Sequence, residues 1–271
     1  MTESPSIITS AHNPRIVALR KLDQRKQREA QGRFAVEGLQ SLHMALDAGL
    51  QPLEVYASSE LFMGTEAPAL LARMRALGTA EISVSAAVMR TLSDRTDPQG
   101  LVATFPLLWR SWSALALGPS DLVVVVDRLN DPGNLGTIIR TADAVGAAAV
   151  ALVTPCVDPF DPKTVRATMG SLFNVPVVAV DDPAASLATL RRTGLRIVGA
   201  DAHLGTPWDG TIWPGGVALL LGNEAQGLAP DLRPEVQAWA SLPMVGRAES
   251  LNVAVAGGIL MYAWLRANWR R

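Results

Sequence analysis

The segment Leu122–Val126 constrains the fold of this chain more than any other, because it consists of a leucine followed by four valines. A continuous β-branched run of this kind is typical of a strand that is buried on both faces of a parallel sheet. Similar runs recur later in the chain, at Ala148–Val153, Val175–Val180, Arg196–Ala200 and Val217–Leu221. Helical segments separate them, so the second half is predicted to be an α/β domain with a mostly parallel sheet.

The first half alternates shorter strand and helix patterns, which predicts a smaller α/β domain. Its strands are expected near residues 34–37, 53–57, 82–84 and 100–105. The stretch 107–119 interrupts this periodicity and carries Trp109 and Trp112. We therefore expect two domains, at residues 1–106 and 120–271, that are joined by a linker at residues 107–119.

The composition is that of a folded protein, with 49% hydrophobic and 18% charged residues in 271. The segment Met1–Asn13 is polar and has no secretory signal pattern, and no apolar stretch is long enough to span a bilayer. Cys156 is the single cysteine, which excludes an intrachain disulfide and a thiolate-rich metal site. We expect a cytoplasmic protein that needs neither membrane nor metal.

Basic residues are concentrated near the start of the chain. Seven of them lie between Met1 and Arg33, against three acidic residues, which is an excess of four. Asn13-Pro14 is a good helix start, and we expect one charged helix from Pro14 to Gln31 that ends near Gly32. Such a segment fits a face that binds a polyanion, although charge alone fits a solvated helix equally well.

Polar loops follow the expected strands of the second half. The first is Asp127–Gly136, which opens a helix that contains Arg140. Glycines at a strand-to-helix turn let backbone N–H groups point at an anion, but the loop has neither the dinucleotide fingerprint nor a P-loop ending. The local sequence by itself favours a turn or cap residue for Asn134 and a surface salt bridge for Arg140.

Two further loops share this position after a strand. Leu221–Leu228 holds Glu224 between glycines, where it is either an acceptor that orients Arg140 or a solvated turn residue. The other runs from Leu242 through Ser250 and Asn252 into a helix rich in small residues. Ser and Asn are common at helix starts, so these two residues are ambiguous when read alone.

Together the three loops resemble the SpoU family of RNA ribose methyltransferases, a branch of the SPOUT class. Asn134-Leu-Gly-Thr-Ile-Ile-Arg140 is similar to the family's first motif, Leu-Gly-Asn-Glu224 with Gly227 to its second, and Pro-Met through Ser250-Leu-Asn252 to its third. The first half resembles the family's L30e-like RNA-binding domain in Arg33–Gly38 and Pro98–Gly100. Ala225 departs from the glycine of many relatives, which puts the conformation of this loop in question.

The resemblance implies an α/β fold with a C-terminal trefoil knot that binds S-adenosylmethionine. The expected residues are as follows: for holding the cofactor by backbone Gly222, Leu242 and Leu251; for catalysis Asn134, Arg140, Glu224, Ser250 and Asn252; for RNA binding Arg25, Lys26, Arg28 and Arg33. It also implies a homodimer that uses the small-residue helix after Asn252, with Ala254, Ala256, Gly257 and Gly258.

The expected activity is methylation of a ribose 2′-OH in structured RNA, with 23S ribosomal RNA favoured by the first domain. Because an arginine hardly loses its proton, we expect Arg140 to bind the target phosphate and stabilise the developing alkoxide. Three alternatives stay open: a transfer RNA 2′-O-methyltransferase, a non-catalytic RNA-binding ribosome assembly factor, and an NAD-dependent oxidoreductase. The sequence argues against the oxidoreductase, because it lacks the acidic residue that binds the ribose in dinucleotide-binding folds.

Overall fold

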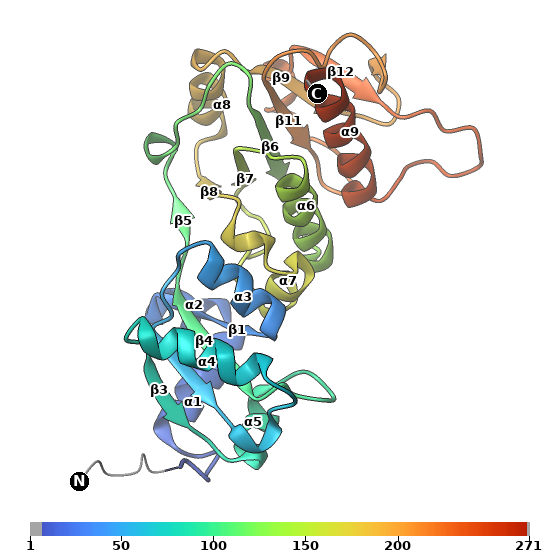
Figure 1. Ribbon diagram of the computed structural model, residues 1–271. Helices are drawn as coiled ribbons and strands as arrows, with labels where there is room; N and C mark the ends of the chain where they lie inside the picture. Colours follow the sequence, from blue (N-terminus) through green and yellow to red (C-terminus); the bar gives the residue numbers. More distant parts are fainter. Residues whose placement is uncertain (1–6, 270–271) are drawn as a thin grey trace. The chain divides into compact units, whose positions relative to one another are not determined.

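The computed structural model describes residues 7–269 of the chain (Figure 1). It divides into two compact units. Unit 1 comprises Met1–Leu107 and Phe160–Asn174, and unit 2 comprises Leu108–Pro159 and Val175–Arg271. Each unit has its own sheet, so each is described by itself.

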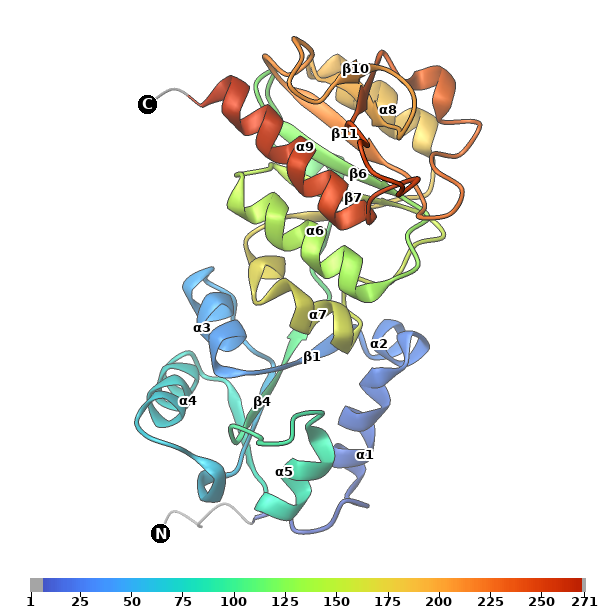
Figure 2. The same cartoon turned by 90° about the vertical axis from the view of Figure 1, so that its right-hand side faces the viewer.

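Unit 1 is built on a four-stranded mixed sheet. In spatial order its strands are β1 (Arg33–Glu37), β4 (Leu101–Pro106), β2 (Glu54–Ala57) and β3 (Ala80–Ser83). β4 is antiparallel to both neighbours, and β2 is parallel to β3. Two pairs of helices flank this sheet (Figure 2): α3 (Leu39–Asp47) with α4 (Glu66–Ala76), and α1 (Pro14–Arg20) with α5 (Ala86–Leu92). The strands agree with the sequence prediction to within two residues at each end.

The prediction of one continuous helix from Pro14 to Gln31 is wrong. α1 ends at Arg20, a 3-10 turn covers Lys21–Asp23, and α2 (Arg25–Gln31) begins after Gln24, which is extended. The break has a tertiary cause. Leu22 is buried in the core of unit 1, and its carbonyl oxygen accepts a hydrogen bond of 2.7 Å from Nη1 of Arg28.

Unit 1 also contains a segment from the second half of the sequence. Phe160–Asn174 includes α7 (Pro162–Thr168) and a 3-10 turn at Ser171–Phe173. Its aromatic side chains pack on those of the first half, with ring centroids 4.9 Å apart for Phe34 and Phe160 and 5.6 Å apart for Phe105 and Phe173. The burial of these rings explains why the segment packs in unit 1, although the residues before and after it belong to unit 2. The functional domain limits of 1–106 and 120–271 stay a prediction.

Unit 2 is built on an eight-stranded sheet in which every neighbouring pair of strands is parallel. In spatial order the strands are β10 (Thr206–Pro207), β12 (Ala238–Ser241), β9 (Arg196–Ala200), β11 (Val217–Leu221), β6 (Leu122–Asp127), β7 (Ala149–Val153), β8 (Val177–Val180) and β5 (Trp109–Arg110). The five strands predicted from the sequence are all present. They form the centre of the sheet.

Helices cover both faces of this sheet. α8 (Pro183–Arg192) contributes Leu187 and Leu190 to a core that includes Val123 and Val125 of β6. α6 (Pro132–Ala144) and α9 (Val253–Asn268) lie side by side on the opposite face (Figures 1 and 2). A sheet covered in this way is buried on both faces, as the run of valines in β6 predicts.

The small residues of α9 are explained by this packing. A Cβ added to Gly257 would lie 2.6 Å from Cδ1 of Leu221 in β11, so a larger residue there would have to displace the buried leucine side chain. At Gly258 an added Cβ would lie 3.7 Å from Cγ2 of Thr141 in α6, which is an ordinary contact. The small residues therefore allow close packing within the subunit, and the homodimer expected from them needs other support.

The segment 107–119, predicted to be a linker, packs on the sheet of unit 2. β5 pairs with β8, and Nε1 of Trp112 donates a hydrogen bond of 3.1 Å to Oγ of Ser186 in α8. Within residues 7–269, no helix is long and apolar enough to cross a membrane. The trefoil knot stays a prediction.

Candidate active site

The site lies where neighbouring strands of the parallel sheet end. β9, β11 and β6 are adjacent, and β12 flanks β9. Because the strands are parallel, their carboxyl ends meet at one edge, where α/β proteins bind ligands. The loops after β6, β11 and β12 are the three that the sequence singles out.

A chain of side-chain hydrogen bonds connects these three loops. Nδ2 of Asn252 donates to Oδ1 of Asn134 at 2.9 Å. Nδ2 of Asn134 in turn donates to Oε1 of Glu224 at 3.0 Å. Three of the five predicted catalytic residues are thus in contact. Two of them, Asn134 and Asn252, are 118 residues apart in the chain.

Asn252 combines the two roles between which the sequence leaves a choice. It is the N-cap of α9, and its Oδ1 accepts hydrogen bonds from the backbone N–H groups of Ala254 at 2.9 Å and Val255 at 3.3 Å. Its Nδ2 stays available for Asn134. Capping therefore fixes the side chain in the orientation that joins it to the other loops. At Asn134 the cap is instead Asp131, whose Oδ1 accepts from the Asn134 backbone at 2.7 Å.

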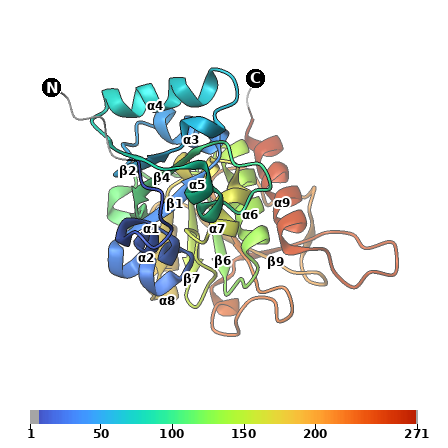
Figure 3. The same cartoon turned by 90° about the horizontal axis from the view of Figure 1, so that it is seen from below.

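A pocket of about 370 Å³ lies at this edge of the sheet. Its volume falls in the range of small-molecule and cofactor sites. The three predicted cofactor residues line it, as do two of the predicted catalytic residues: Gly222, Leu242, Leu251, Glu224 and Ser250. The long loop from β12 to α9, which carries Ser250, reaches out from the sheet before it returns to the helix (Figure 3).

The pocket is lined by both apolar and acidic side chains. Leu221, Leu242 and Leu260 contribute apolar surface, whereas Asp201, Glu224 and Glu249 contribute carboxylates. An apolar wall suits a flat or aliphatic ligand, and several carboxylates favour a ligand with positive charge. Asp201 is partly compensated, because Nη2 of Arg233 lies 3.4 Å from its Oδ2.

Within the described part of a single chain, Arg140 does not contact the other predicted catalytic residues. It lies on α6 with an exposed side chain and does not line the pocket. Within residues 7–269, no hydrogen bond connects its guanidinium to Asn134, Glu224 or Asn252. The structure thus gathers four of the five predicted catalytic residues in and beside the pocket and leaves Arg140 outside it.

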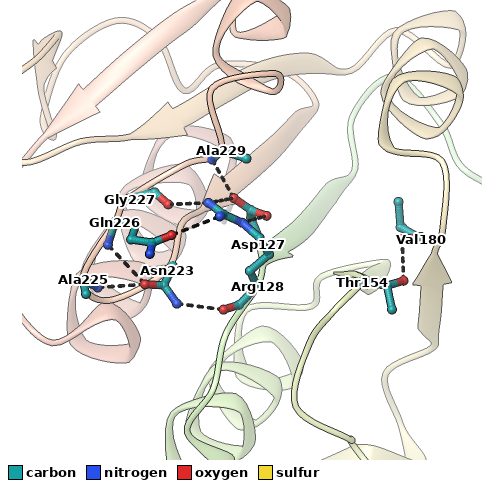
Figure 4. A network of polar contacts seen from close by, with 9 residues as sticks. All are labelled: Asp127, Arg128, Thr154, Val180, Asn223, Ala225, Gln226, Gly227 and Ala229. Carbon is teal, nitrogen blue, oxygen red and sulfur yellow. Dashed lines mark hydrogen bonds and ion pairs between the residues drawn. The ribbon is translucent and has the colours of Figure 1, made fainter.

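The loop after β11 is held by its own asparagine (Figure 4). Oδ1 of Asn223 accepts from the backbone N–H groups of Ala225 at 3.0 Å and Gln226 at 3.1 Å. Gly227 has a φ of 68°, which suits glycine. In residues 7–269, the non-glycine residues with positive φ are Arg128 and Met169. Ala225 is therefore accommodated without the strain that its departure from glycine suggested.

The single cysteine lies near the same edge. Burial raises the pKa of Cys156 to about 11, and the negative charges of Asp127 and Glu224 contribute to this increase. A thiol with so high a pKa stays protonated near neutral pH and is a poor nucleophile.

The predicted RNA-binding residues of unit 1 differ in accessibility. Arg28 is 2% exposed and lies with its Nη2 3.7 Å from Oδ2 of Asp161. Arg33 is mostly buried and paired with Glu54. Arg25 and Lys26 are exposed, although Arg25 Nε also donates to Glu29 Oε1 at 2.8 Å. The structure thus gives Arg28 a role in the core of unit 1, and leaves Arg25 and Lys26 on its surface.

The residues of the pocket lining that sequence reasoning missed include Asp201 and His203. Both follow directly after β9, and a backbone N–H of His203 donates to Oδ1 of Asp201 at 2.9 Å. Their position beyond the end of a predicted parallel strand was the available signal. It is the same signal that identified the other three loops.

The fold and the site define an α/β protein with a ligand pocket at the carboxyl edge of a parallel sheet. Comparison with known proteins identifies the family within this class. A family model described as the SpoU rRNA Methylase family matches residues 121–262, and the MRM3-like substrate binding domain matches residues 13–103. The chain therefore belongs to the SpoU rRNA methylase family, and the resemblance of its three loops to that family is confirmed.

Relatives match over nearly the whole length. The 23S rRNA (guanosine(2553)-2′-O)-methyltransferase RlmP of Bacillus subtilis is 32% identical over 94% of this chain and 97% of its own. The 23S rRNA (uridine(2479)-2′-O)-methyltransferase of Streptomyces viridochromogenes is 30% identical over 90% of this chain and 86% of its own. Among solved structures, the AdoMet-bound rRNA methyltransferase from Sinorhizobium meliloti is 34% identical with a TM-score of 0.87, and the match covers 96% of this chain and 97% of that one.

Proposed function

We propose that this chain methylates a ribose 2′-OH in 23S ribosomal RNA, with S-adenosylmethionine as the methyl donor. The observation that carries the proposal is the hydrogen-bonded chain Asn252–Asn134–Glu224 beside a pocket that Glu224 also lines. It joins the three sequence motifs of the family at one place. The near full-length relatives that methylate 23S ribosomal RNA support the same substrate.

The pocket fits this cofactor. Its apolar wall suits an adenine ring, and its carboxylates suit the positive charge that S-adenosylmethionine carries on its sulfonium and ammonium groups. The backbone of Gly222, Leu242 and Leu251 would hold the cofactor. When bound, S-adenosylmethionine would supply the methyl group: its S–CH3 bond would break as the ribose O–CH3 bond forms, the thioether would leave, and the 2′-proton would pass to water or to the phosphate.

The side chains around the pocket have separate tasks. Asn134 and Asn252 orient the ribose and keep Glu224 in place through their hydrogen bonds. Ser250 lines the pocket beside them. Arg140 binds the phosphate next to the target ribose and stabilises the charge that develops on the 2′-oxygen. Much of the rate would come from holding the reacting groups in attack geometry.

Residues 1–106 bind the substrate RNA, and residues 120–271 carry the methyltransferase site. The match of residues 13–103 to a substrate binding domain supports this division. Arg25 and Lys26 contribute phosphate contacts from the surface of unit 1. The proposed ribosomal RNA substrate supports a location in the cytoplasm.

The enzyme acts as a homodimer. α9 exposes a row of large apolar side chains, Val255, Ile259 and Tyr262, at spacings that place them on one side of the helix. A second copy of this chain is the occupant that best explains them, because Arg140 lies outside the pocket of its own subunit. Since α6 and α9 pack side by side, a partner bound along α9 would bring a second Arg140 close to this edge of the sheet.

The proposal is tested by incubating the chain with methyl-labelled S-adenosylmethionine and total RNA of a strain that lacks the gene. Label is expected in 23S ribosomal RNA at a 2′-oxygen, and mapping the ribose methylations lost in that strain identifies the nucleotide. Calorimetry should show saturable binding of S-adenosylmethionine and none of NAD. Label in transfer RNA alone, or no transfer at all, would contradict the proposal.

A further inference from the structure

We propose that Asp127 and Arg128 are positioning residues that hold the loop Asn223–Gly227 in the arrangement that binds the cofactor. The inference rests on the proposed function, since it takes this loop as a wall of the cofactor pocket. Neither residue belongs to the sequence motifs that are expected to serve catalysis or cofactor binding. Their contacts form the network drawn in Figure 4.

Asp127 is the buried centre of this network. The residue is 0% exposed at the end of β6. Its Oδ2 accepts from the backbone N–H of Ala229 at 2.7 Å, and its Oδ1 accepts from Nε of Arg128 at 3.0 Å. Nη2 of Arg128 also donates to Oδ2 at 3.2 Å. A buried carboxylate needs such partners, and one of them is the backbone just beyond the loop.

Arg128 connects the other parts of the loop. Its Nη1 donates to Oε1 of Gln226 at 3.2 Å, and its Nη2 lies 3.4 Å from the carbonyl oxygen of Gly227. Its own carbonyl oxygen accepts from Nδ2 of Asn223 at 2.9 Å. The start, the tip and the end of the loop are therefore all tied to this one residue. The hydrogen bonds to Asp127 also raise the pKa of the guanidinium, so it stays charged.

The backbone of Arg128 is unusual as well. Its φ is 51°, in the left-handed region that residues with a side chain rarely adopt. Such a conformation persists where the surrounding contacts over-determine it, and it often occurs near functional sites. In Arg128 this conformation directs both the side chain and the backbone carbonyl toward the neighbouring loop. The guanidinium donates to Gln226, and the carbonyl oxygen accepts from Asn223.

The loop that these contacts hold has two functional features. Asn223, Glu224, Ala225 and Gly227 line the pocket. Glu224 is also the end of the hydrogen-bonded chain from Asn134. Arg128 itself does not line the pocket, so its effect on the cofactor must pass through the loop. A loop with several arrangements would bind the cofactor in proportion to the share of the competent one.

The test uses the full-length chain and the variant Arg128→Ala, with Arg192→Ala as a matched control. Arg192 is an exposed arginine of α8 whose Nη2 donates to Thr189 within its own helix. In the protein without added cofactor, Arg128→Ala should speed amide hydrogen exchange in residues 223–229. By calorimetry it should raise the Kd for S-adenosylmethionine about tenfold, as expected if the loop is competent about a tenth of the time.

Kinetics separate this role from a purely stabilising one. Arg128→Ala should raise KM for S-adenosylmethionine and leave kcat at saturation close to wild type, because bound cofactor selects the competent loop. Arg128→Lys keeps a charge beside Asp127 but lacks the fork, so its Kd should be intermediate. Gln226→Ala removes one acceptor on the surface and should change the Kd in the same direction by less. Arg192→Ala should match wild type throughout.

The proposal is overturned if Arg128→Ala leaves both the exchange and the Kd unchanged, or if kcat falls while Kd and KM do not move. If Arg128→Ala fails to fold, Arg128→Lys and Gln226→Ala decide by the same criteria. Failure of the wild-type chain to bind S-adenosylmethionine would instead contradict the proposed function. The exchange measurement would still report on the loop in that case.

Discussion

Asn134 donates a hydrogen bond of 3.0 Å to Glu224, and this contact joins the loop after β6 to the loop after β11. The two strands are neighbours in the sheet, so their loops begin at the same edge. The amide of Asn134 has its oxygen occupied by Asn252 at 2.9 Å and its nitrogen by Glu224. A single side chain thereby fixes the mutual positions of three motifs.

Replacement of Asn134 should therefore reduce methyl transfer strongly. Asn134→Ala releases both neighbours, and misplacement of groups at a reacting centre costs about a hundredfold in rate. Asn134→Asp should be worse, because it sets a second carboxylate against Glu224. The measurement is kcat with 23S ribosomal RNA, and Thr189→Ala on α8, at the opposite face of the sheet, is the control. Equal rates for Asn134→Ala and wild type would show that this contact has no catalytic role.

Arg140→Ala should abolish transfer while the cofactor binds as in wild type. Loss of a group that stabilises developing charge costs about 10²–10³ in kcat, whereas Arg140 does not line the pocket. Arg140→Lys keeps the charge without the planar fork and should recover part of the rate. Calorimetry for the cofactor and single-turnover kinetics for the transfer check both statements. Near-normal turnover of Arg140→Ala would remove it from the site.

Dimer formation should depend on the apolar face of α9. Tyr262 is 52% exposed, and Tyr262→Glu would place a charge in the proposed interface. We expect the wild-type chain to sediment as a dimer and this variant as a monomer with little activity. Met63→Glu makes the same kind of change at an apolar side chain of unit 1 that is exposed at 85%, and it should sediment as wild type does. A monomeric wild-type chain would exclude the proposed interface.

Two adjacent glycines of α9 should respond in opposite ways to alanine. Gly257→Ala places a Cβ 2.6 Å from Leu221, and overpacking of this kind costs about 1–3 kcal/mol in the free energy of unfolding. Gly258→Ala meets Thr141 at 3.7 Å and should stabilise the helix by about 0.5–1 kcal/mol. Urea unfolding of both variants provides the comparison. A stable Gly257→Ala would mean that the Leu221 side chain can move aside at little cost.

The basic residues of unit 1 should separate into two groups. Arg25→Ala with Lys26→Ala should weaken RNA binding and lower the salt slope of the affinity by about two, one for each lost phosphate contact. Arg28→Ala should instead lower the stability of unit 1 by about 2–4 kcal/mol, since it removes a buried hydrogen bond to Leu22 and the charge beside Asp161.

Salt titrations of RNA affinity and thermal unfolding measure the two effects. Arg73→Ala with Arg75→Ala, which removes two exposed arginines paired with Asp47 and Glu81, controls for net charge. An unchanged salt slope in the double variant would exclude the proposed RNA surface.

The sequence by itself determined the central strands and the loops that follow them. Runs such as Leu122–Val126 carry their own signal, since uninterrupted β-branched residues suit a strand buried on both faces. Glycine and asparagine after such a run mark a strand-to-loop junction, which is why Glu224 and Asn134 could be identified as candidates. β12, which lies between β10 and β9, was predicted only as an apolar strand end at Leu242, because Ala238–Ser241 is short and has no β-branched residue.

The tertiary structure decided how these residues are used. The sequence could not reveal that Asn252 both caps α9 and donates to Asn134, because that contact joins residues 118 apart in the chain. Nor could it show that Arg28 is buried, that Phe160–Asn174 packs in unit 1, or that Gly257 packs against Leu221. Local patterns record the conformation of the backbone and the side that is buried, whereas partners distant in sequence are fixed by packing and by the need to satisfy buried polar groups.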